Sequence, residues 1–422
     1  MLRSLFSGVS GLRNHQIRLD VISNNIANVN TIGFKGSRAT FRDVLYQTML
    51  GATAPQGGRG GINPRQVGLG VSIGSIDSVM SQGNIETTGR NTDLAIEGDG
   101  FFILGDDNGA QFFTRAGAFS LDQVGNLVNA GNGLKVVGWN ADPTTGVLDP
   151  NNAVPGFIRI IRGQEMPPRA TTTVDYLGNL DAREVTGATR TAQKTVYDSL
   201  GNTHELTITF TKVDPAIHPN RWTWTATCSD PTITVDDGAG GVATGTVDFT
   251  NGGAFEGEVP ATPTVRFSGI LGADDLVMTL DFDHLTQYAS AATANAGEQD
   301  GYLRGSLTEF SMDTSGVITG YYTNGRSRAL AQVALALFNN PEGLMRWGDT
   351  LFQESNNSGV PQIGVALSGG RGTLKPGALE MSNVDLSQEF TNLIITQRGF
   401  QASSRVITTS DEVLQELVNL KR

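Results

Sequence analysis

The chain has 422 residues, of which 53 are glycine, and a formal net charge of −12 at pH 7. The length exceeds that of one typical domain and predicts roughly two to four units. Glycine is well above its usual ~7 %, and with many Thr, Asn and Asp it indicates a turn-rich β protein. The acidic balance excludes nucleic acid as a partner, because binding phosphates requires clustered Lys and Arg.

Cysteine content and hydropathy exclude further classes. The single cysteine allows no internal disulfide and no Cys-based metal cage. No apolar run approaches the ~18 residues of a membrane span, so we expect no membrane insertion. The first residues, MLRSLFSGVSG, lack the apolar core of a signal peptide. We therefore expect a protein that stays in the cytoplasm or leaves by a route that reads no cleaved signal.

Both ends of the chain carry apolar residues at seven-residue spacing, which is typical of a coiled-coil seam. These residues are Leu5, Leu12, Leu19 and Ile26 at one end and Leu386, Leu393, Phe400, Ile407 and Leu414 at the other. Asp385 or Ser382 is placed to cap the second helix. The two helices are natural partners for each other, although each could instead dock separately on a globular core.

The companion positions of these heptads are half polar, as at Gln16, Ser23 and Gln397. An isolated pair of such helices is marginal in water. Gly8 and Gly11 weaken the first helix further, by roughly 1 kcal/mol each relative to Ala. We therefore expect both ends to be loose in a monomer and to become ordered when other copies bury their apolar faces. This favours a polymer whose core is built from the terminal helices.

The pattern changes after the first helix. The spacing of Phe41, Val44, Leu45 and Met49 predicts a short second helix. Residues 51–70, GATAPQGGRGGINPRQVGLG, contain many Gly and Pro and no apolar period. They predict a long loop that serves as a linker or contact arm.

Strand signatures dominate from about residue 71. The clearest are DLAIEGDGFFIL (93–104), QFFTRAGAFSLDQVGNLV (111–128), LKVVGW (134–139) and three stretches of alternating apolar residues at 206–210, 222–228 and 276–282. Turn residues separate them. Such half-buried strands are typical of a β-sandwich or barrel.

The β region divides at Pro/Gly/Asn-rich segments, 141–156 and 293–301. We predict a mainly β fold with α-helical termini, nested so that an inserted β-barrel or sandwich domain interrupts a discontinuous β host domain. The predicted parts are a terminal helical domain (1–30 and 384–422), a connecting segment (31–70 and 365–383), an inner β domain (71–145 and 301–364) and an inserted outer β domain (146–300).

Five motifs then identify a family resemblance. They are NNIANVNTIGFK (24–35), TDLAIEGDGFFIL (92–104), FTRAGAFSLDQVGNLV (113–128), TVYDSLGN (195–202) and GALEMSNVDLSQEFTNLIITQRGFQASSRVI (377–407). In these motifs and their order the chain resembles the rod and hook axial proteins of the bacterial flagellum, over nearly its whole length. The large insert and the YDSLGN element resemble the hook branch, because rod proteins of this type carry little between the two halves of the host domain.

The resemblance implies a structural role without catalysis. In hook proteins the paired terminal helices form an inner tube around an export channel. Their β domains stack outward and slide past neighbours, so that the tube bends while it transmits motor torque. The family motif implied here consists of Asn24, Asn25, Asn28, Asn30, Thr31, Gly33, Phe34 and Lys35.

The implied partners follow from the same resemblance. They are other copies of the chain, the flagellar rod at one end, the hook–filament junction protein at the other, the hook cap and the flagellar type III export apparatus. The implied location is the extracellular flagellum, reached without a cleaved signal peptide. Two alternatives stay open: a distal rod-type axial protein, and a secreted oligomeric β protein that binds surfaces.

Catalytic, cofactor-binding and metal sites are not predicted. No histidine stands four residues from another. DFDH (281–284) lies at the exposed end of an alternating strand, which outweighs its interpretation as a metal pair. GLGVSIG (68–74) precedes strands instead of opening a helix, so it does not predict a nucleotide loop. DDNG (106–109) predicts a hairpin turn, since the rest of a calcium loop is missing.

Cys228 alternates with Trp222 and Trp224, which predicts a buried, inert thiol. Some hook proteins, notably those of spirochaetes, are similar but cross-link their subunits through a Cys and a Lys. The cysteine of that pattern precedes Asn-Leu-Asp, and this chain has Gly178 there. We therefore do not expect this cross-link at that position.

Overall fold

The computed structural model describes residues 2–55, 60–143, 145–150, 154–214, 216, 218 and 220–420. Residues 56–59 of the predicted loop, 144 and 151–153 of the predicted boundary at 141–156, and 1, 421 and 422 of the predicted terminal domain lie outside the described residues. The chain divides into two compact units. Unit 1 comprises 1–161, 310–319 and 329–422, and unit 2 comprises 162–309 and 320–328.

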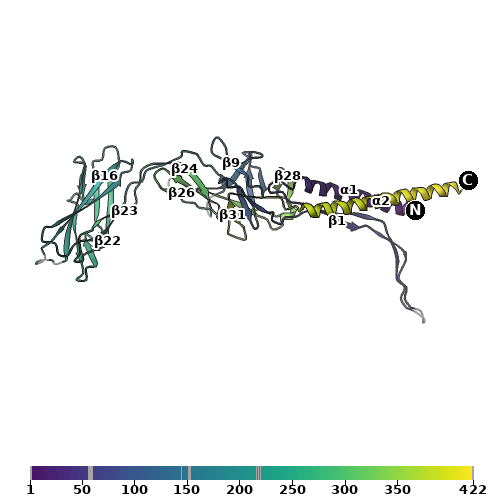
Figure 1. The fold of residues 1–422 in the computed structure, drawn as a ribbon, viewed down its shortest axis with the longest axis horizontal. Coiled ribbons are helices and arrows are strands. Elements are labelled where there is room, and N and C mark those ends of the chain that lie inside the picture. The colour runs from purple at the N-terminus through teal and green to yellow at the C-terminus, as the bar shows by residue number, and fades with distance from the viewer. Residues whose placement is uncertain are drawn as a thin grey trace. The chain divides into compact units, whose positions relative to one another are not determined.

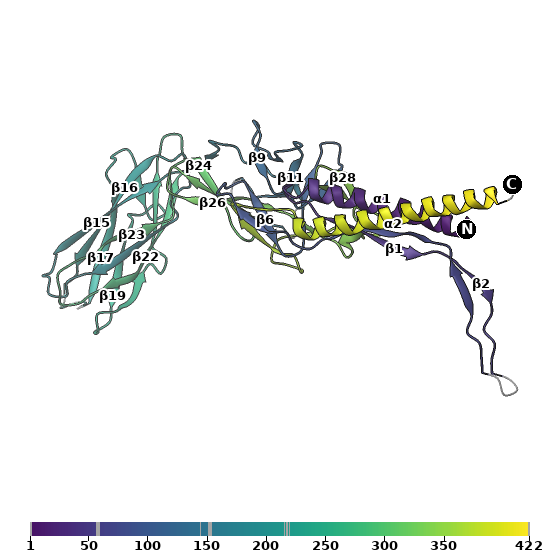
Figure 2. The same cartoon turned by 45° about the vertical axis from the view of Figure 1, so that its right-hand side comes forward.

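Unit 1 begins and ends with two long helices, α1 (Leu2–Ala27) and α2 (Leu386–Asn419), which lie side by side (Figures 1 and 2). The pairing predicted for the terminal helices is confirmed. The Asp385 carboxylate accepts hydrogen bonds from the backbone N–H groups of Ser387 and Gln388, which confirms it as the cap of α2. Among the described residues, neither helix combines the length and hydropathy that crossing a bilayer requires.

The predicted helix at Phe41–Met49 is wrong. The segment forms β1 (Ser37–Asp43), which pairs with β4 (Val71–Ser78), and β2 (Tyr46–Leu50), which pairs with β3 (Arg65–Gly68). Pairing with distant strands overrides the weak local helical spacing. The predicted loop at 51–70 is also partly wrong, because it contains β3. The resulting β2–β3 hairpin extends away from the helix pair (Figures 1 and 2).

The β part of unit 1 is built from both halves of the chain. Strands before residue 161 pair with strands after residue 329: β6 with β31, β5 with β32, β7 with β27 and β8 with β29. The strands are β5 (Ile85–Thr87), β6 (Leu94–Glu97), β7 (Phe101–Gly105), β8 (Gln111–Thr114), β9 (Phe119–Leu121), β10 (Leu127–Asn129), β11 (Lys135–Asn140), β12 (Gly156–Phe157), β27 (Leu335–Leu337), β28 (Met345–Gly348), β29 (Leu351–Gln353), β30 (Gln362–Gly364), β31 (Thr373–Pro376) and β32 (Ala378–Glu380), with a 3-10 turn η1 (Pro341–Gly343). Phe101, Phe113 and Phe338 pack edge to face in the core. The predicted discontinuous β host fold is therefore confirmed.

Unit 2 contains two five-stranded sheets, in the orders β15-β16-β17-β19-β20 and β18-β21-β22-β14-β23. Its strands are β13 (Glu165–Met166), β14 (Thr173–Asn179), β15 (Thr189–Tyr197), β16 (Thr203–Lys212), β17 (Arg221–Cys228), β18 (Thr234–Asp236), β19 (Thr244–Phe249), β20 (Phe255–Val259), β21 (Thr264–Ser268), β22 (Leu276–Thr286) and β23 (Asn295–Gln299). Three further strands, β24 (Gly305–Met312), β25 (Val317–Tyr322) and β26 (Ser327–Val333), carry residues of both units. Alternating inward residues of both sheets, among them Trp222, Trp224 and Phe282, form one core.

Candidate functional site

Small residues bring the two terminal helices together. A Cβ atom at Gly8 would lie 3.3 Å from Ile407 Cγ1, and one at Gly11 would lie 3.0 Å from Ser403 Oγ. On α2, a Cβ at Gly399 would lie 2.6 Å from His15 Cε1. The seam therefore depends on close backbone approach. The sequence interpretation treated Gly8 and Gly11 only as weakening the helix and missed this role.

The heptad residues border this seam without being fully buried. Leu5, Leu12, Leu19, Ile26, Leu393, Phe400, Ile407 and Leu414 are half-buried, and Leu386 is exposed. The most buried side chains of the pair include Ile22, Asn14 and Thr396. Asn14 Nδ2 donates to the carbonyl oxygen of Val71 at 2.7 Å, which ties α1 to β4. The role of the heptads in assembly stays a prediction.

Other apolar side chains of the helices are uncovered. On α2 the exposed ones are Phe390, Ile394, Ile395, Val406, Val413 and Val418, with Leu420 directly after the helix, and on α1 they are Phe6 and Ile17. Val406, Val413 and Leu420 recur every seven residues, and Phe390 and Ile394 are one turn apart. At 3.6 residues per turn, Ile395, Val406 and Val413 lie on one side of α2, and Phe390 and Ile394 lie beside them at the start of the helix. We name these five side chains the exposed helix face; together they are too apolar for an ordinary solvated surface.

The family motif forms the turn that follows α1. Asn25 exchanges two hydrogen bonds with the backbone of Ser37, at 2.8 and 2.9 Å. Asn28 Nδ2 donates to Asn24 Oδ1, and the Thr31 hydroxyl donates to Asn28 Oδ1 at 3.1 Å. Asn30 is exposed. These bonds end the helix and fix the direction in which the chain leaves it.

Gly33 and Phe34 complete the turn. Gly33 has φ +68°, and a Cβ there would lie 2.5 Å from the Ala116 nitrogen, so only glycine fits this position. Its N–H donates to the Glu380 carbonyl oxygen at 2.8 Å. Phe34 is buried beneath the Arg346 guanidinium, which lies 5.3 Å from its ring centre. The motif thus contacts the inner β domain closely.

A buried ion cluster joins three distant parts of unit 1. The Lys35 ammonium donates to Glu380 Oε1 at 2.6 Å, and Arg115 Nη1 donates to Glu380 Oε2 at 3.3 Å. Lys35 and Glu380 are only 1 % and 0 % exposed. Burial lowers the pKa of Lys35, and the negative charge of Glu380 opposes that effect. The Gly83 N–H also donates to Glu380 Oε1. The cluster fixes the segment after α1 and the segment before α2 to the β fold.

Sequence reasoning singled out Lys35 but not its partners. Arg115 and Glu380 stand inside the motifs FTRAGAF and GALEMSN. The motifs could therefore have marked both residues as candidates, but nothing in the sequence indicates that they contact each other. Asn383 was also missed: its side chain accepts from the Gly36 N–H and donates to the Val79 and Ser81 carbonyl oxygens.

The motif turn lines a cavity of about 750 Å³ in unit 1. Asn24, Asn28 and Thr31 line one part of it, and the opposite part comes from residues 129–132 and 348–352. Charged residues, among them Lys35, Arg346 and Asp349, also line this cavity.

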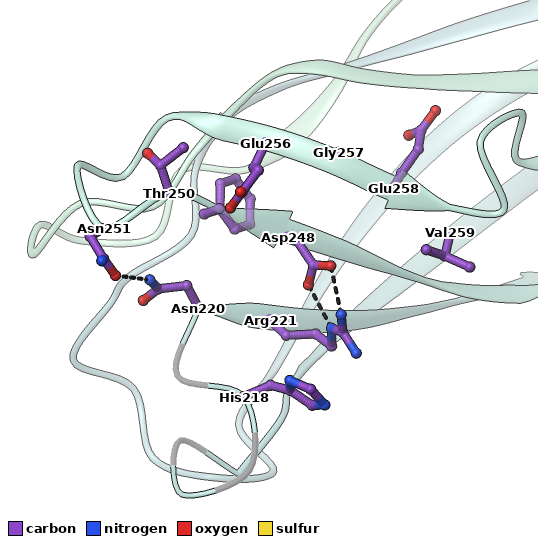
Figure 3. Close-up of a pocket in the computed structure, with 11 residues that line it drawn as sticks. His218, Asn220, Arg221, Asp248, Thr250, Asn251, Glu256, Gly257, Glu258 and Val259 are labelled. Atoms are coloured by element: carbon purple, nitrogen blue, oxygen red, sulfur yellow. Dashed lines mark hydrogen bonds and ion pairs between the residues drawn. The ribbon is translucent and has the colours of Figure 1, made fainter.

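Unit 2 has a polar cavity of about 670 Å³ (Figure 3). Arg221 and Asp248 form a two-bond ion pair at 2.6 and 2.7 Å, and Glu258 points away from it (Figure 3). Burial raises the pKa of Glu258 to about 7, and the charges of Asp283 and Asp281 add to this shift. Among the described residues, no group of three or more His, Cys, Asp or Glu could hold a metal ion.

Cys228 packs against the core of unit 2 but is half-buried, so it is less buried than the sequence predicted. Gly178 has φ +115°. A Cβ there would lie 2.6 Å from the Thr293 carbonyl oxygen. The backbone at this position therefore disfavours any side chain, including a cysteine.

Four family models match separate parts of the chain. The model described as flagella basal body rod protein matches residues 5–35, and the flagellar hook protein FlgE/F/G D1 domain matches residues 95–171. The flagellar basal body protein FlaE D2 domain matches residues 167–302, and the flagellar basal body rod FlgEFG protein C-terminal model matches residues 375–420.

Full-length relatives decide the family. The flagellar hook protein FlgE of Treponema pallidum is 42 % identical, with 100 % of both chains covered. That of Salmonella typhimurium is 35 % identical, with 99 % of this chain and 100 % of the relative covered. This chain belongs to the flagellar hook protein family. The basal-body rod protein FlgG of Bacillus subtilis is also similar, at 33 % identity with 100 % of both chains covered.

Solved structures agree on the fold. The crystal structure of Helicobacter pylori flagellar hook protein FlgE2 matches with a TM-score of 0.53, covering 70 % of this chain and 100 % of that one at 16 % identity. The three residues of the ion cluster lie in segments matched by three different family models. Lys35 lies in the segment matched by the rod protein model, Arg115 in the D1 segment and Glu380 in the C-terminal segment. The family motifs thus meet in space at the junction between helices and β fold.

Proposed function

We propose that this chain is the structural subunit that self-assembles into the flagellar hook, the flexible tube that transmits motor torque from rod to filament. The observation that carries the proposal is the exposed helix face, where Phe390, Ile394 and Ile395 are each more than half exposed. In the folded monomer about half of each of these side chains stays in contact with water. Burial against other copies would stabilise the polymer by up to ~1.5–3 kcal/mol for each side chain.

We assign the parts of the chain to layers of this tube. Residues 1–30 and 384–422 form the inner tube around a central export channel, and residues 31–70 and 365–383 connect it to the β domains. Residues 71–145 and 301–364 form the inner β layer, and residues 146–300 form the outer one. The support is the division into two compact units and the nested pairing of early with late strands.

The β2–β3 hairpin supplies a second contact between copies. Its exposed apolar side chains include Leu45, Tyr46 and Met49, which are 73 %, 53 % and 67 % exposed. A two-stranded ribbon with such side chains is marginal by itself. Burial against a neighbouring subunit would cover them and hold the hairpin in place.

The remaining partners follow from a place in the hook. One end of the polymer would meet the flagellar rod and the other the hook–filament junction protein. A hook cap would guide addition of subunits, and the flagellar type III export apparatus would deliver them to the extracellular flagellum.

Negative-stain electron microscopy of the concentrated protein tests the proposal. We expect curved tubes, whereas discrete oligomers would contradict it. Ile395→Glu places a carboxylate on the exposed helix face, where burial without a partner costs several kcal/mol in the polymer. This variant should stay a folded monomer and fail to elongate. Gln401→Glu, an exposed polar position on the same helix, is the matched control and should assemble normally.

The similarity to the basal-body rod protein FlgG of Bacillus subtilis, at 33 % identity, favours a second candidate, a distal rod-type axial subunit. The same micrographs separate the two, because a rod subunit forms straight, stiff tubes and a hook subunit forms tubes that bend.

A further inference from the structure

The two outward faces of the unit 2 sandwich differ in chemistry. Strands β15, β16, β17 and β19 turn buried residues such as Ile208, Phe210 and Trp224 inward and present threonines outward. We name the outward residues the threonine face. In register across the strands they form the rows Thr189–Thr211–Thr223–Thr246, Thr191–Thr209–Thr225–Thr244 and Gln193–Thr207–Thr227.

The threonine face is uncharged at its centre. Charged side chains stand only at its margins, where Arg221 and Asp248 neutralise each other and Glu205 follows the last row. On the other sheet, Asp175 and Asp281 stand opposite each other on β14 and β22. Unit 2 as a whole carries more acidic than basic residues. An uncharged face is therefore where two copies of this acidic unit meet with the least repulsion.

Several hydroxyl groups of this face are already engaged with the sheet. The Thr223 hydroxyl donates to the Thr211 carbonyl oxygen at 3.2 Å, and the Thr244 hydroxyl donates to the Trp224 carbonyl oxygen at 2.7 Å. These bonds leave methyl groups and oxygen lone pairs directed outward. Such a surface forms many weak contacts and no strong, directional one.

The regular register makes these contacts repeat. Strands in a sheet are spaced by ~4.8 Å, and residues on one face by ~7 Å along a strand. A partner that shifts by one such repeat meets threonine again. The patch measures roughly 14 by 14 Å, far below the ~800 Å² per partner of a stable dimer. It is therefore too small to join two free monomers and suited to copies that a polymer already holds together.

We propose that the threonine face is the surface on which the outer domain of one subunit slides over a second copy of this chain as the tube bends. The inference rests on the proposed function and names the residues of its movable contact. The contact can move because neighbouring registers are nearly equal in energy. The threonine pattern repeats, and it carries no charge that would fix one register.

A photo-crosslinking residue tests the contact. Full-length chains carry benzoylphenylalanine in place of Thr225, at the centre of the threonine face, or in place of Thr279, an exposed threonine on β22 in the charged face. Irradiated tubes of the Thr225 variant should give covalent dimers and higher oligomers. Dilute monomer of the same variant and tubes of the Thr279 variant should give mainly monomer. Tubes of the Thr225 variant without covalent dimers, or equal yields at both positions, would overturn the inference.

A second variant tests the sliding. Thr209→Glu with Thr225→Glu places repelling charges in the central row while the terminal helices stay unchanged. Tubes should still form, and their distribution of curvatures should change relative to unsubstituted tubes and to Thr279→Glu. Tubes with unchanged curvature would overturn the inference and leave the proposed function intact. Failure of the unsubstituted chain to form tubes would overturn both.

Discussion

The helix pair and the sandwich of unit 2 bury different kinds of residue. In unit 2, Trp222, Trp224, Phe210 and Phe282 are almost completely buried. The Phe282 ring contacts those of Trp224 and Phe210, with centres 5.7 Å apart in both pairs. In the helix pair, glycines lie at close contacts with the opposite helix, against Ile407, Ser403 and His15, and large apolar side chains remain exposed. The sandwich buries its large apolar side chains within unit 2, whereas the helices leave several of theirs exposed, where other copies could cover them.

This difference separates folding from assembly. Full burial of an aromatic side chain stabilises the unit in which it lies without any partner. The exposed helix face contributes only when a neighbour covers it. A subunit organised in this way can have a folded unit 2 while the exposed helix face is still uncovered.

The largest expected effect is the loss of an aromatic side chain from the sandwich. Trp224→Ala should destabilise unit 2 by ~3–5 kcal/mol, measured as a lower denaturation midpoint of the sandwich. The unfolding of the helix pair, followed by its helical circular dichroism, should not change in this variant. Thr225→Ala, the outward neighbour on the same strand, should change stability by less than ~1 kcal/mol. Equal effects of the two substitutions would contradict the contrast between the regions.

Removal of the central carboxylate of the ion cluster should have a comparable effect at the junction. Glu380→Gln leaves Lys35 and Arg115 buried without a full counter-charge, which should cost ~3–5 kcal/mol in unit 1. The control is Glu165→Gln, because Glu165 pairs with Arg304 while both side chains are mainly exposed; it should cost less than ~1 kcal/mol. Chemical denaturation followed separately for each unit measures both, and a stable Glu380→Gln variant would argue against the cluster as a structural link.

Overpacking of the seam should have an intermediate effect. Gly399→Leu forces the His15 ring to move and should destabilise the helix pair by ~1–3 kcal/mol, measured by thermal loss of helical circular dichroism. His15→Ala in the same chain should restore part of the loss, because it opens space for the new side chain. Gly51→Ala, where a Cβ meets nothing within 4 Å, is the control. Absence of rescue would show that the two residues do not share the seam.

The smallest effects are expected from pH, with opposite signs in the two regions. Burial lowers the pKa of His15 below its ordinary 6.5, and Arg18 adds to this. The fold therefore prefers neutral His15, and the helix pair should lose stability as pH falls below about 6.5. His15→Gln should remove this dependence. Helical circular dichroism between pH 5 and 7.5 measures it, and a flat profile for the unsubstituted chain would contradict the seam geometry.

Glu258 should act in the opposite direction. Its pKa is raised from the ordinary 4.5 to about 7, so the fold prefers the protonated acid. The contribution of Glu258 to the stability of unit 2 is complete below pH 4.5 and is lost as pH rises through about 7. Since Glu258 is only partly buried, we expect a change of about 1 kcal/mol after allowance for solvent screening. Thermal melts of unit 2 should show this slope, and Glu258→Gln should abolish it.

Much of the architecture could be predicted from local patterns. Alternation with period two placed β16, β17 and β22, and the seven-residue spacing together with Asp385 placed the terminal helices. The helix predicted around Val44 was wrong because this segment forms strands. Pairing with β4, more than twenty residues later, stabilises β1, and a local sequence window contains no information on that pairing.

The site was less accessible to prediction. Lys35 stood out within a family motif, but its partner Glu380 lies 345 positions away. No spacing rule connects such residues. The seam was missed for a different reason: helix propensity counts Gly8 and Gly11 as costs, and their value appears only when a second backbone lies against them.

Hydrogen exchange of α2 in monomer and tube tests the central claim most directly. We predict that backbone amides of residues 386–419 exchange rapidly in dilute monomer and become protected by at least ~100-fold in assembled tubes. Amides of β16 and β17 should be equally protected in both states. Equal protection of α2 in monomer and tube would contradict the claim that the exposed helix face is completed by other copies.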